Sequence, residues 1–330
     1  MDMTDGILGK TALAALILFS ISLSCAAEDR IDAALRAAVE GFPAAAQGRT
    51  VVSLGNFTYS DKKIGSPFSR YLSEKIGAIL ARSGRYEYFN REKLDEVLKA
   101  AELGMSDLFD PNTAVPVNLQ AVQAVLSGTF FDAGTTVKVF LELQDVGSGG
   151  TRGKTEADLP KGDIPAGVAV LPENYAGALS VLEELGAIQG SSDLKVRIWT
   201  DRGDGGTYRD GERLVVNFFA SMDCYIRIFH IDVNGTMKLI FPNQYFTDNL
   251  VRAKRIYKIP DASYPFTFDL GAPFGTEFIK VVASTAPFTD RVEAFEDLGK
   301  AAQKVATRGL NVNLRQKLVT EGLLNYAIVK

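Results

Sequence analysis

The spacing of hydrophobic residues changes near Asp193, which predicts one kind of fold before this residue and a different kind after it. Before Asp193, runs with the three-to-four-residue period of a helix alternate with short apolar runs typical of buried strands. After it, apolar residues recur at every second position, as in Leu194, Val196 and Ile198, which is the pattern of a strand with one buried face. The sequence therefore predicts an α+β protein of two domains.

The first domain is expected over residues 48–165. Ser66 is predicted to cap a helix that carries one apolar stripe and ends at Gly84. In chain order, the expected elements are strands over 51–59 and 86–89, with the 66–84 helix between them, helices over 90–104 and 117–122, strands over 124–131 and 135–146, and an edge strand over 155–159. This order predicts a two- or three-layer α/β domain with a mixed sheet.

The second domain is expected over residues 193–330, after a linker over 166–192 that contains a short helix ending at Gly186. Turn sequences separate its alternating runs, and Asn234-Gly235 gives the strongest hairpin signal in the chain. Many short strands at regular spacing predict an antiparallel, immunoglobulin-like β-sandwich. A helix over 298–308 and a last strand over 324–329 are expected near its end.

The first 27 residues have the pattern of a signal peptide. An apolar run over 11–23 follows Lys10 and is too short to span a bilayer as a helix. Small residues at Ala26 and Ala27 then fit cleavage after Ala27, which predicts export to the periplasm or outer membrane. Cys25 is an alternative lipidation site, although Ser22 replaces the leucine usual three positions before such a cysteine. A buried helix is the third interpretation.

The chain contains few histidine and cysteine side chains. The chain has 330 residues but one histidine and two cysteines, which excludes most metal sites, histidine-assisted nucleophiles and thiol chemistry. We predict no catalytic, cofactor-binding or metal-binding residues, and hence a protein that is not an enzyme. The net charge of -4 gives no basic surface for nucleic acid.

Both halves resemble known families. The segments VVSLGNF, SRYLSEKIGAILARSGRYEYFNREKLDEVLKAAEL and AVLSGTFFDAGTTVKVFLELQDVGSG resemble the periplasmic domain shared by the flagellar protein FlgO and the curli secretion protein CsgG. This resemblance implies a domain that assembles at the outer membrane and binds other proteins. The later segments WTDRGDGGTYRDGERLVVNFFASMDCYIRIFHIDVNGTMKLIFPN and FDLGAPFGTEFIKVVAS resemble a bacterial domain-of-unknown-function (DUF) family found in envelope and caspase-like proteins. No catalytic residues are assigned in that family, so the resemblance implies none here.

Three motifs have a simple structural interpretation. Residues 148–155, SGGTRGKT, end like a phosphate-binding loop but precede a short polar stretch closed by Pro160, so a strand-to-strand turn is predicted. An acidic loop is interpreted as solvated turns, with calcium binding left open; its residues are Asp201, Asp204, Asp210 and Glu212. Cys224 and His230 share a strand face about 20 Å apart, which rules out joint chemistry between them.

An aromatic and proline-containing set near the hairpin ends is the candidate partner-binding patch. Its residues are Tyr208, Tyr225, Phe241, Pro242, Asn243, Tyr245 and Phe246. Most residues of such a set are nevertheless expected to pack in the core.

The leading hypothesis is a non-enzymatic, outer-membrane-associated or periplasmic component that binds envelope proteins or self-associates. The alternative is a periplasmic sensor of a small ligand or glycan in the crevice between the domains. An enzyme that uses a carboxylate pair is the third choice, because the distances between carboxylates are invisible in a sequence.

Overall fold

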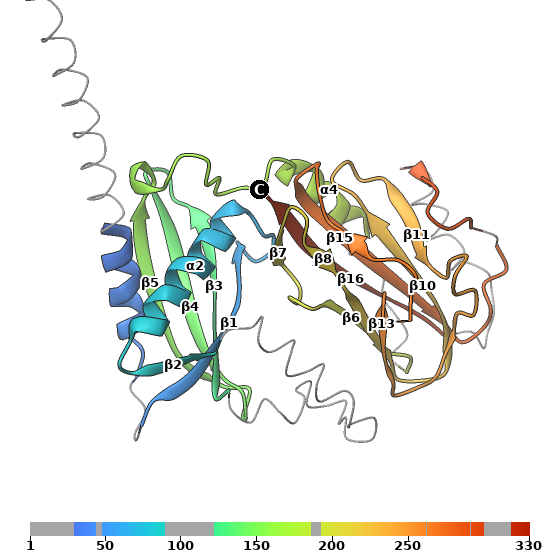
Figure 1. The fold of residues 1–330 in the computed structure, drawn as a ribbon, viewed down its shortest axis with the longest axis horizontal. Coiled ribbons are helices and arrows are strands. Elements are labelled where there is room, and N and C mark those ends of the chain that lie inside the picture. Colours follow the sequence, from blue (N-terminus) through green and yellow to red (C-terminus); the bar gives the residue numbers. More distant parts are fainter. Residues whose placement is uncertain are drawn as a thin grey trace, which may run out of the picture. The chain divides into compact units, whose positions relative to one another are not determined.

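The computed structural model describes residues 30–43, 48–89, 122–185, 193–261, 263–290, 292–299 and 318–330 (Figure 1). The chain forms two compact units. The first unit contains residues 1–55, 71–91 and 120–168, and the second contains residues 56–70, 92–119 and 169–330. The described residues do not include the predicted signal peptide with Cys25 or the helix expected over 90–104, and they include only the ends of the helices expected over 117–122 and 298–308.

The first unit is built on a five-stranded sheet of order β2-β1-β3-β4-β5. The strands are β1 (Thr50–Tyr59), β2 (Tyr86–Phe89), β3 (Ala124–Asp132), β4 (Thr136–Asp145) and β5 (Thr151–Pro160). β1 and β2 pair in parallel, whereas β3, β4 and β5 pair antiparallel. The predicted mixed sheet is confirmed. The predicted strand-to-strand turn lies at residues 146–150, between β4 and β5, whereas residues 151–155 of the phosphate-loop-like segment belong to β5. A short 3-10 helix, Lys161–Asp163, follows β5.

Helix α2 (Pro67–Arg82) begins where the sequence predicts. The Ser69 amide donates to the Ser66 hydroxyl oxygen at 3.4 Å, and the Ser66 amide donates to the Ser69 hydroxyl oxygen at 2.9 Å. These reciprocal bonds satisfy amide groups that the first turn of a helix leaves without partners. Leu72 and Ile76 of the predicted apolar stripe are fully buried.

A helix over residues 30–40 also packs in the first unit, and it extends that unit beyond the predicted boundary at residue 48. Ile31, Leu35 and Val39 are fully buried, with the 3–4 spacing of a helix stripe. Asp32 forms an ion pair with Lys75 of α2 at 2.9 Å, so the two helices lie side by side. The stripe follows directly after the predicted signal peptide and precedes the domain expected over residues 48–165.

The described residues of the second unit form three sheets. A six-stranded sheet has the order β11-β10-β15-β16-β7, with β12 paired to β10; the others have the orders β13-β9-β6 and β14-β8. The strands are β6 (Val196–Thr200), β7 (Gly206–Arg209), β8 (Arg213–Leu214), β9 (Val216–Ala220), β10 (Cys224–Ile231), β11 (Met237–Phe241), β12 (Leu250–Val251), β13 (Ile256–Ile259), β14 (Phe268–Asp269), β15 (Gly275–Ser284) and β16 (Val319–Val329).

The six-stranded sheet is buried on both faces, which distinguishes this unit from the predicted two-sheet sandwich. Ile226 and Ile228 of β10 join one core with Phe218 of β9. On the other face, Phe229 packs with helix α4 (Tyr175–Leu185), which lies in the predicted linker and is part of the core (Figure 1). All ten residues of β15 are buried as a result.

The predicted antiparallel pairing is wrong for one pair of strands. β16 and β7 run parallel, whereas the other registered pairs of the second unit are antiparallel. The molecule is therefore a mixed α+β protein with few helices and several sheets. The alternating runs predicted strands correctly, but alternation does not specify which strands become neighbours.

Candidate functional site

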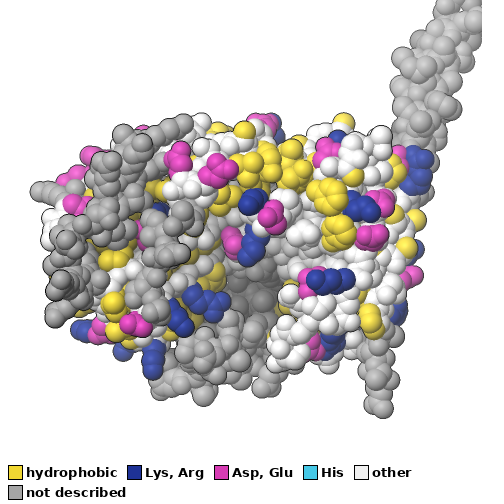
Figure 2. Space-filling view, turned by 180° about the vertical axis from the view of Figure 1, so that it is seen from behind, with side chains coloured by type: hydrophobic (Ala, Val, Ile, Leu, Met, Phe, Trp, Pro, Cys, Tyr) yellow, Lys and Arg dark blue, Asp and Glu magenta, His cyan; other side chains and the backbone are white. Residues whose placement is uncertain are grey.

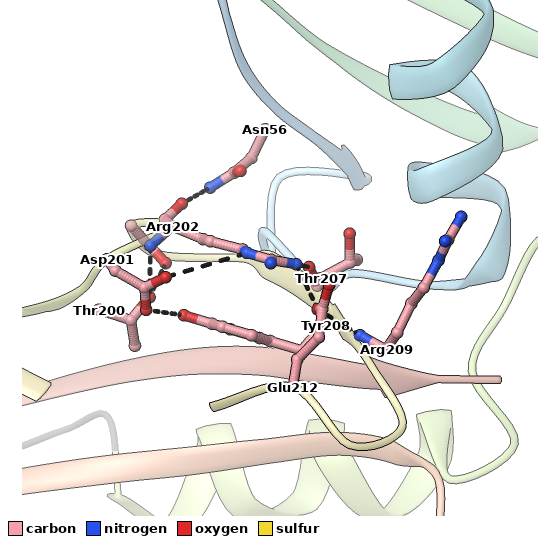
Figure 3. A network of polar contacts seen from close by, with 9 residues as sticks. Asn56, Thr200, Asp201, Arg202, Thr207, Tyr208, Arg209 and Glu212 are labelled. Atoms are coloured by element: carbon pink, nitrogen blue, oxygen red, sulfur yellow. Dashed lines mark hydrogen bonds and ion pairs between the residues drawn. The ribbon is translucent and has the colours of Figure 1, made fainter. Parts of the chain in front are cut away.

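A polar network surrounds the loop between β6 and β7 in the second unit (Figure 3). The Arg202 guanidinium donates to the Thr207 carbonyl at 2.6 Å and to the Glu212 carboxylate at 2.7 Å, and it lies 4.5 Å from the centre of the Tyr208 ring. The Arg209 amide also donates to Glu212 at 2.6 Å. Burial acts to raise the pKa of Glu212, but these donors outweigh it and the pKa falls below its usual value.

Tyr208 of β7 connects this loop to Tyr326 of β16 in the six-stranded sheet. Its hydroxyl donates to the Asp201 carboxylate at 2.5 Å, and its ring meets Tyr326 edge-on at 5.7 Å. The Tyr326 hydroxyl donates to the Glu277 carboxylate at 2.6 Å. Burial, and then a neighbouring carboxylate, raise the pKa of both tyrosines well above the usual range, so both remain protonated hydrogen-bond donors.

The acidic loop makes contacts within the second unit. The Asn56 amide nitrogen donates to the carbonyls of Arg202 and Asp204 at 2.8 and 2.9 Å. The Asp204 carboxylate accepts from the Asn325 amide at 3.1 Å and lies 3.4 Å from the Lys63 ammonium. Gly205 has φ 76, and a Cβ there would approach the Lys63 carbonyl to 2.5 Å, so this position requires glycine.

From the sequence, the acidic loop is interpreted as turns, and calcium binding by it is left open. Asp201, Asp204 and Glu212 are bonded to different protein donors rather than to one common centre. Within the described parts of the chain, no group of three or more His, Cys, Asp or Glu side chains is placed to hold a metal ion.

His230 and Cys224 lie at opposite ends of β10 and have separate surroundings. His230 Nε2 lies 2.8 Å from Glu277 Oε2, a contact that links β10 to β15 and that the sequence analysis missed. Cys224 is a free, fully buried cysteine, and burial raises the pKa of its thiol to about 11. A protonated, buried thiol is a poor nucleophile.

Three residues of the predicted partner-binding patch are buried and do not belong to a surface. Tyr208, Phe241 and Asn243 are 0%, 5% and 4% exposed. The Asn243 side chain holds a turn, because its amide donates to the Ile240 carbonyl and its oxygen accepts from the Tyr245 amide, both at 3.0 Å. Tyr225, Pro242 and Phe246 are half-buried, whereas Tyr245 is exposed. Partner binding by these four residues remains a prediction.

Tyr245 and Phe246 belong to a larger group of contacting rings, which we call the aromatic cluster. Its members are Tyr245, Phe246, Tyr264, Phe266, Phe268 and Phe295. Phe266 is the hub, with ring centres 5.3 Å from Tyr245, 5.3 Å from Tyr264, 5.4 Å from Phe268 and 6.0 Å from Phe295. Phe246 stacks on Tyr264 at 3.8 Å.

The aromatic cluster is anchored on its inner side and open on its outer side. Phe246, Tyr264 and Phe268 pack against the core of the second unit. Tyr245 is 50% exposed and Phe295 is 37% exposed. The sequence analysis missed four of the six rings because they come from separate loops; the density of aromatic residues between Tyr257 and Phe268 was the available signal.

The first unit has a smaller exposed aromatic group, the Phe131–Phe140 pair. These rings stack with centres 5.8 Å apart on neighbouring strands β3 and β4, and they are 37% and 39% exposed. Figure 2 shows the side of the molecule opposite to Figure 1, where hydrophobic side chains lie among acidic and basic ones. Charges of both signs are interspersed on that side.

No helix within the described ranges is both long and apolar enough to cross a membrane.

Comparisons with known proteins confirm the predicted resemblance of both halves. Residues 19–141 match the family described as "Curli production assembly/transport component CsgG", and residues 207–287 match "Domain of unknown function (DUF4384)". No curated protein sequence matches the chain significantly.

Several solved structures of bacterial proteins align with part of the chain. The LpoB C-terminal domain from Escherichia coli is 13% identical, with 39% of this chain and 98% of that chain covered and a TM-score of 0.30. Lipoprotein GNA1162 from Neisseria meningitidis is 18% identical, with 42% and 97% covered and a TM-score of 0.24. The PelC dodecamer from Paraburkholderia phytofirmans is 19% identical, with 38% and 81% covered and a TM-score of 0.23.

Proposed function

We propose that this protein is a non-enzymatic component of the bacterial cell envelope that binds other envelope proteins through the aromatic cluster. The observation that carries the proposal is the set of six contacting rings with Tyr245 half exposed to water. Covering apolar surface is favourable by about 25 cal/mol per Å². Aromatic residues are also over-represented among the residues that dominate binding energy at protein interfaces. A cluster that is rigid before binding loses little conformational entropy on association.

The family match of the first half supports the envelope setting. The family is described as an assembly and transport component for curli production, and it covers residues 19–141. The signal peptide predicted over residues 1–27 agrees with export, and cleavage after Ala27 or lipidation of Cys25 would each deliver the chain to the periplasm or outer membrane. Self-association through the same surface is the other form of the proposal.

The reactive groups of the second unit support a binding role rather than catalysis. The Cys224 thiol is buried and protonated at neutral pH. His230 faces Glu277, whose carboxylate also accepts from Tyr326, so these side chains form a structural link between strands. An enzyme based on a carboxylate pair and a sensor of small ligands both remain alternatives without an observation that favours them.

The proposal is tested by retention of envelope proteins on the purified mature chain. We expect the Tyr245→Ser/Phe295→Ser variant to lose the proteins that the wild type retains. The Phe131→Ser/Phe140→Ser variant is the matched control and should keep them, because it removes two exposed rings, 37% and 39% accessible, from the first unit. Equal retention by both variants would contradict the proposal.

Localisation is tested separately by cell fractionation of the full chain and of Cys25→Ala. Mature protein in the cytosol would contradict the envelope assignment. Loss of membrane association in Cys25→Ala alone would assign the anchor to a lipid on Cys25.

A further inference from the structure

The loops that build the aromatic cluster are strongly acidic. The six rings lie in three segments, residues 242–250, 260–269 and 286–298. These segments contain Arg291 as their single basic residue, against the acidic residues Asp248, Asp261, Asp269, Asp290, Glu293, Glu296 and Asp297. The whole chain is close to balanced, with 40 acidic and 36 basic residues. Basic residues outside these segments pair with three of the seven carboxylates, Asp269, Asp290 and Asp297, which leaves Asp248, Asp261, Glu293 and Glu296 as the other acidic residues of the segments.

Some of these carboxylates are already neutralised and others face water. Asp297 pairs with Lys238 at 3.1 Å, and Asp269 lies 3.3 Å from Arg213. Asp261 is exposed, and it accepts from the Ser263 amide at 2.7 Å and the Ser263 hydroxyl at 2.6 Å, both uncharged donors. Burial raises the pKa of the Tyr264 hydroxyl to about 12, and the nearby negative charge of Asp261 contributes to this rise. Glu296, next to Phe295, is exposed as well.

We propose that the aromatic cluster and its surrounding carboxylates bind a basic segment of a partner protein, with arginine side chains stacked on the exposed rings. This inference rests on the proposed function and names the chemistry of the partner. A guanidinium group is planar and weakly hydrated, so it stacks on an aromatic face while its N–H groups bond a carboxylate. Tyr245 and Phe295 supply exposed faces, and Asp261 and Glu296 supply exposed carboxylates.

The second unit already holds two of its own arginines in this way. Arg227 lies 4.4 Å from the centre of the Phe288 ring and donates to the Asp290 carboxylate at 2.7 Å. Phe288 and Asp290 belong to the same segment that contributes Phe295. Arg202 repeats the arrangement with Tyr208 and Glu212 at the β6–β7 loop (Figure 3). The fold thus pairs an aromatic face with a carboxylate for guanidinium binding at two internal positions.

Other partners fit this surface less well. Nucleic acids and anionic lipid headgroups carry negative charge and would be repelled by the acidic loops. A purely apolar partner would gain nothing from the carboxylates and would have to desolvate them. Neutral glycans also stack on aromatic rings, and the experiment includes one for this reason.

The test is fluorescence anisotropy with the full mature chain and a labelled twelve-residue peptide of repeated Gly-Arg-Gly-Lys. We expect saturable binding that weakens with added salt. Tyr245→Ser should weaken binding about tenfold, as expected for losing a stacking face at a binding hot spot. Asp261→Asn/Glu296→Gln should weaken it about three- to fivefold and reduce its salt dependence. Phe140→Ser in the first unit is the control and should leave binding unchanged.

Three results would overturn the inference. These are binding unaffected by both cluster variants, equal binding of a peptide with glutamate in place of arginine and lysine, and preferential binding of a neutral hexasaccharide. Thermal melts of each variant verify folding, and Tyr245 is exposed enough to tolerate serine. If the peptide fails to bind while the cluster variant still loses envelope proteins, the partner chemistry is wrong and the proposed function stands. If neither effect occurs, both are wrong.

Discussion

The exposed aromatic residues of the two units occupy different settings. Phe131 and Phe140 of the first unit lie on a sheet where Lys138 is 3.9 Å from Glu156 and 3.6 Å from Asp158, so a basic side chain lies between the carboxylates beside the pair. The aromatic cluster of the second unit lies in loops with a large excess of carboxylates. Exposed apolar residues are common on any protein. The number of exposed rings, the contacts between them and the charge around them together distinguish a recognition surface from ordinary exposed apolar residues.

A buried charge pair provides the largest expected contrast between the units. Lys280 and Glu321 of the second unit lie 2.7 Å apart and are 1% and 5% exposed, whereas Lys138 of the first unit is part-exposed. Lys280→Met should cost about 3–5 kcal/mol because it leaves Glu321 buried without a counter-charge. Lys138→Met should cost less than about 1 kcal/mol.

Urea unfolding measures this contrast. The single tryptophan, Trp199 in β6, reports the second unit by fluorescence, and circular dichroism follows the rest. Adding Glu321→Leu to Lys280→Met should restore much of the lost stability. Equal effects of the two lysine variants would show that the buried pair is no more demanding than a surface pair.

Two buried tyrosine hydroxyl groups, one in each unit, allow a second comparison in which the expected losses of stability are smaller. Tyr326 of the second unit donates to the Glu277 carboxylate at 2.6 Å, and Tyr86 of the first unit donates to the Val39 carbonyl at 3.2 Å. Tyr326→Phe should cost about 1.5–3 kcal/mol because the acceptor is charged, and Tyr86→Phe about 0.5–1.5 kcal/mol. Thermal unfolding of the two variants ranks them. A larger loss for Tyr86→Phe would contradict the importance assigned to the Glu277 network.

The smallest expected effect is a pH dependence in the first unit. Asp145 at the β4–β5 turn accepts from the Ser148 amide and hydroxyl at 2.7 and 2.9 Å and from Arg152, which lowers its pKa from 3.8 to about 2. Because the folded-state pKa lies below the unfolded one, Asp145 stabilises the turn above its unfolded pKa. This contribution is lost as the pH falls through the folded pKa.

Asp145→Asn isolates this contribution. The stability difference between wild type and variant, measured by urea unfolding with circular dichroism, should shrink between about pH 4 and pH 2. A difference that stays constant over this range would show that the carboxylate charge does not hold the turn.

The parts of the fold that depend on neighbouring residues could be predicted from the sequence. The Ser66 cap, the β3–β4 hairpin and most strands follow from residue types a few positions apart. The helix over residues 30–40 was also within reach, since Ile31, Leu35 and Val39 form a regular stripe. Alternation in β10 predicted one buried face but not helix α4 on the other, because a strand pattern contains no information about what covers it.

The candidate site depended on distant contacts and was predicted only in part. Tyr245 and Phe246 were named from the sequence, but Phe266 joins them from another loop. His230 and Glu277 are 47 residues apart, and only the β10–β15 register brings them together. Tyr208 was named in the candidate partner-binding patch, yet it faces inward beside Tyr326 because β7 pairs with the last strand of the chain.

Site-specific photocrosslinking in the native envelope tests the central claim most directly. A photoreactive phenylalanine analogue replaces Tyr245 in one version of the chain and Phe140 in another, both at exposed positions. The account predicts adducts with a discrete set of envelope proteins at position 245, at segments rich in arginine and lysine, and few at position 140. Adducts of equal yield at both positions, or at position 140 alone, would contradict it.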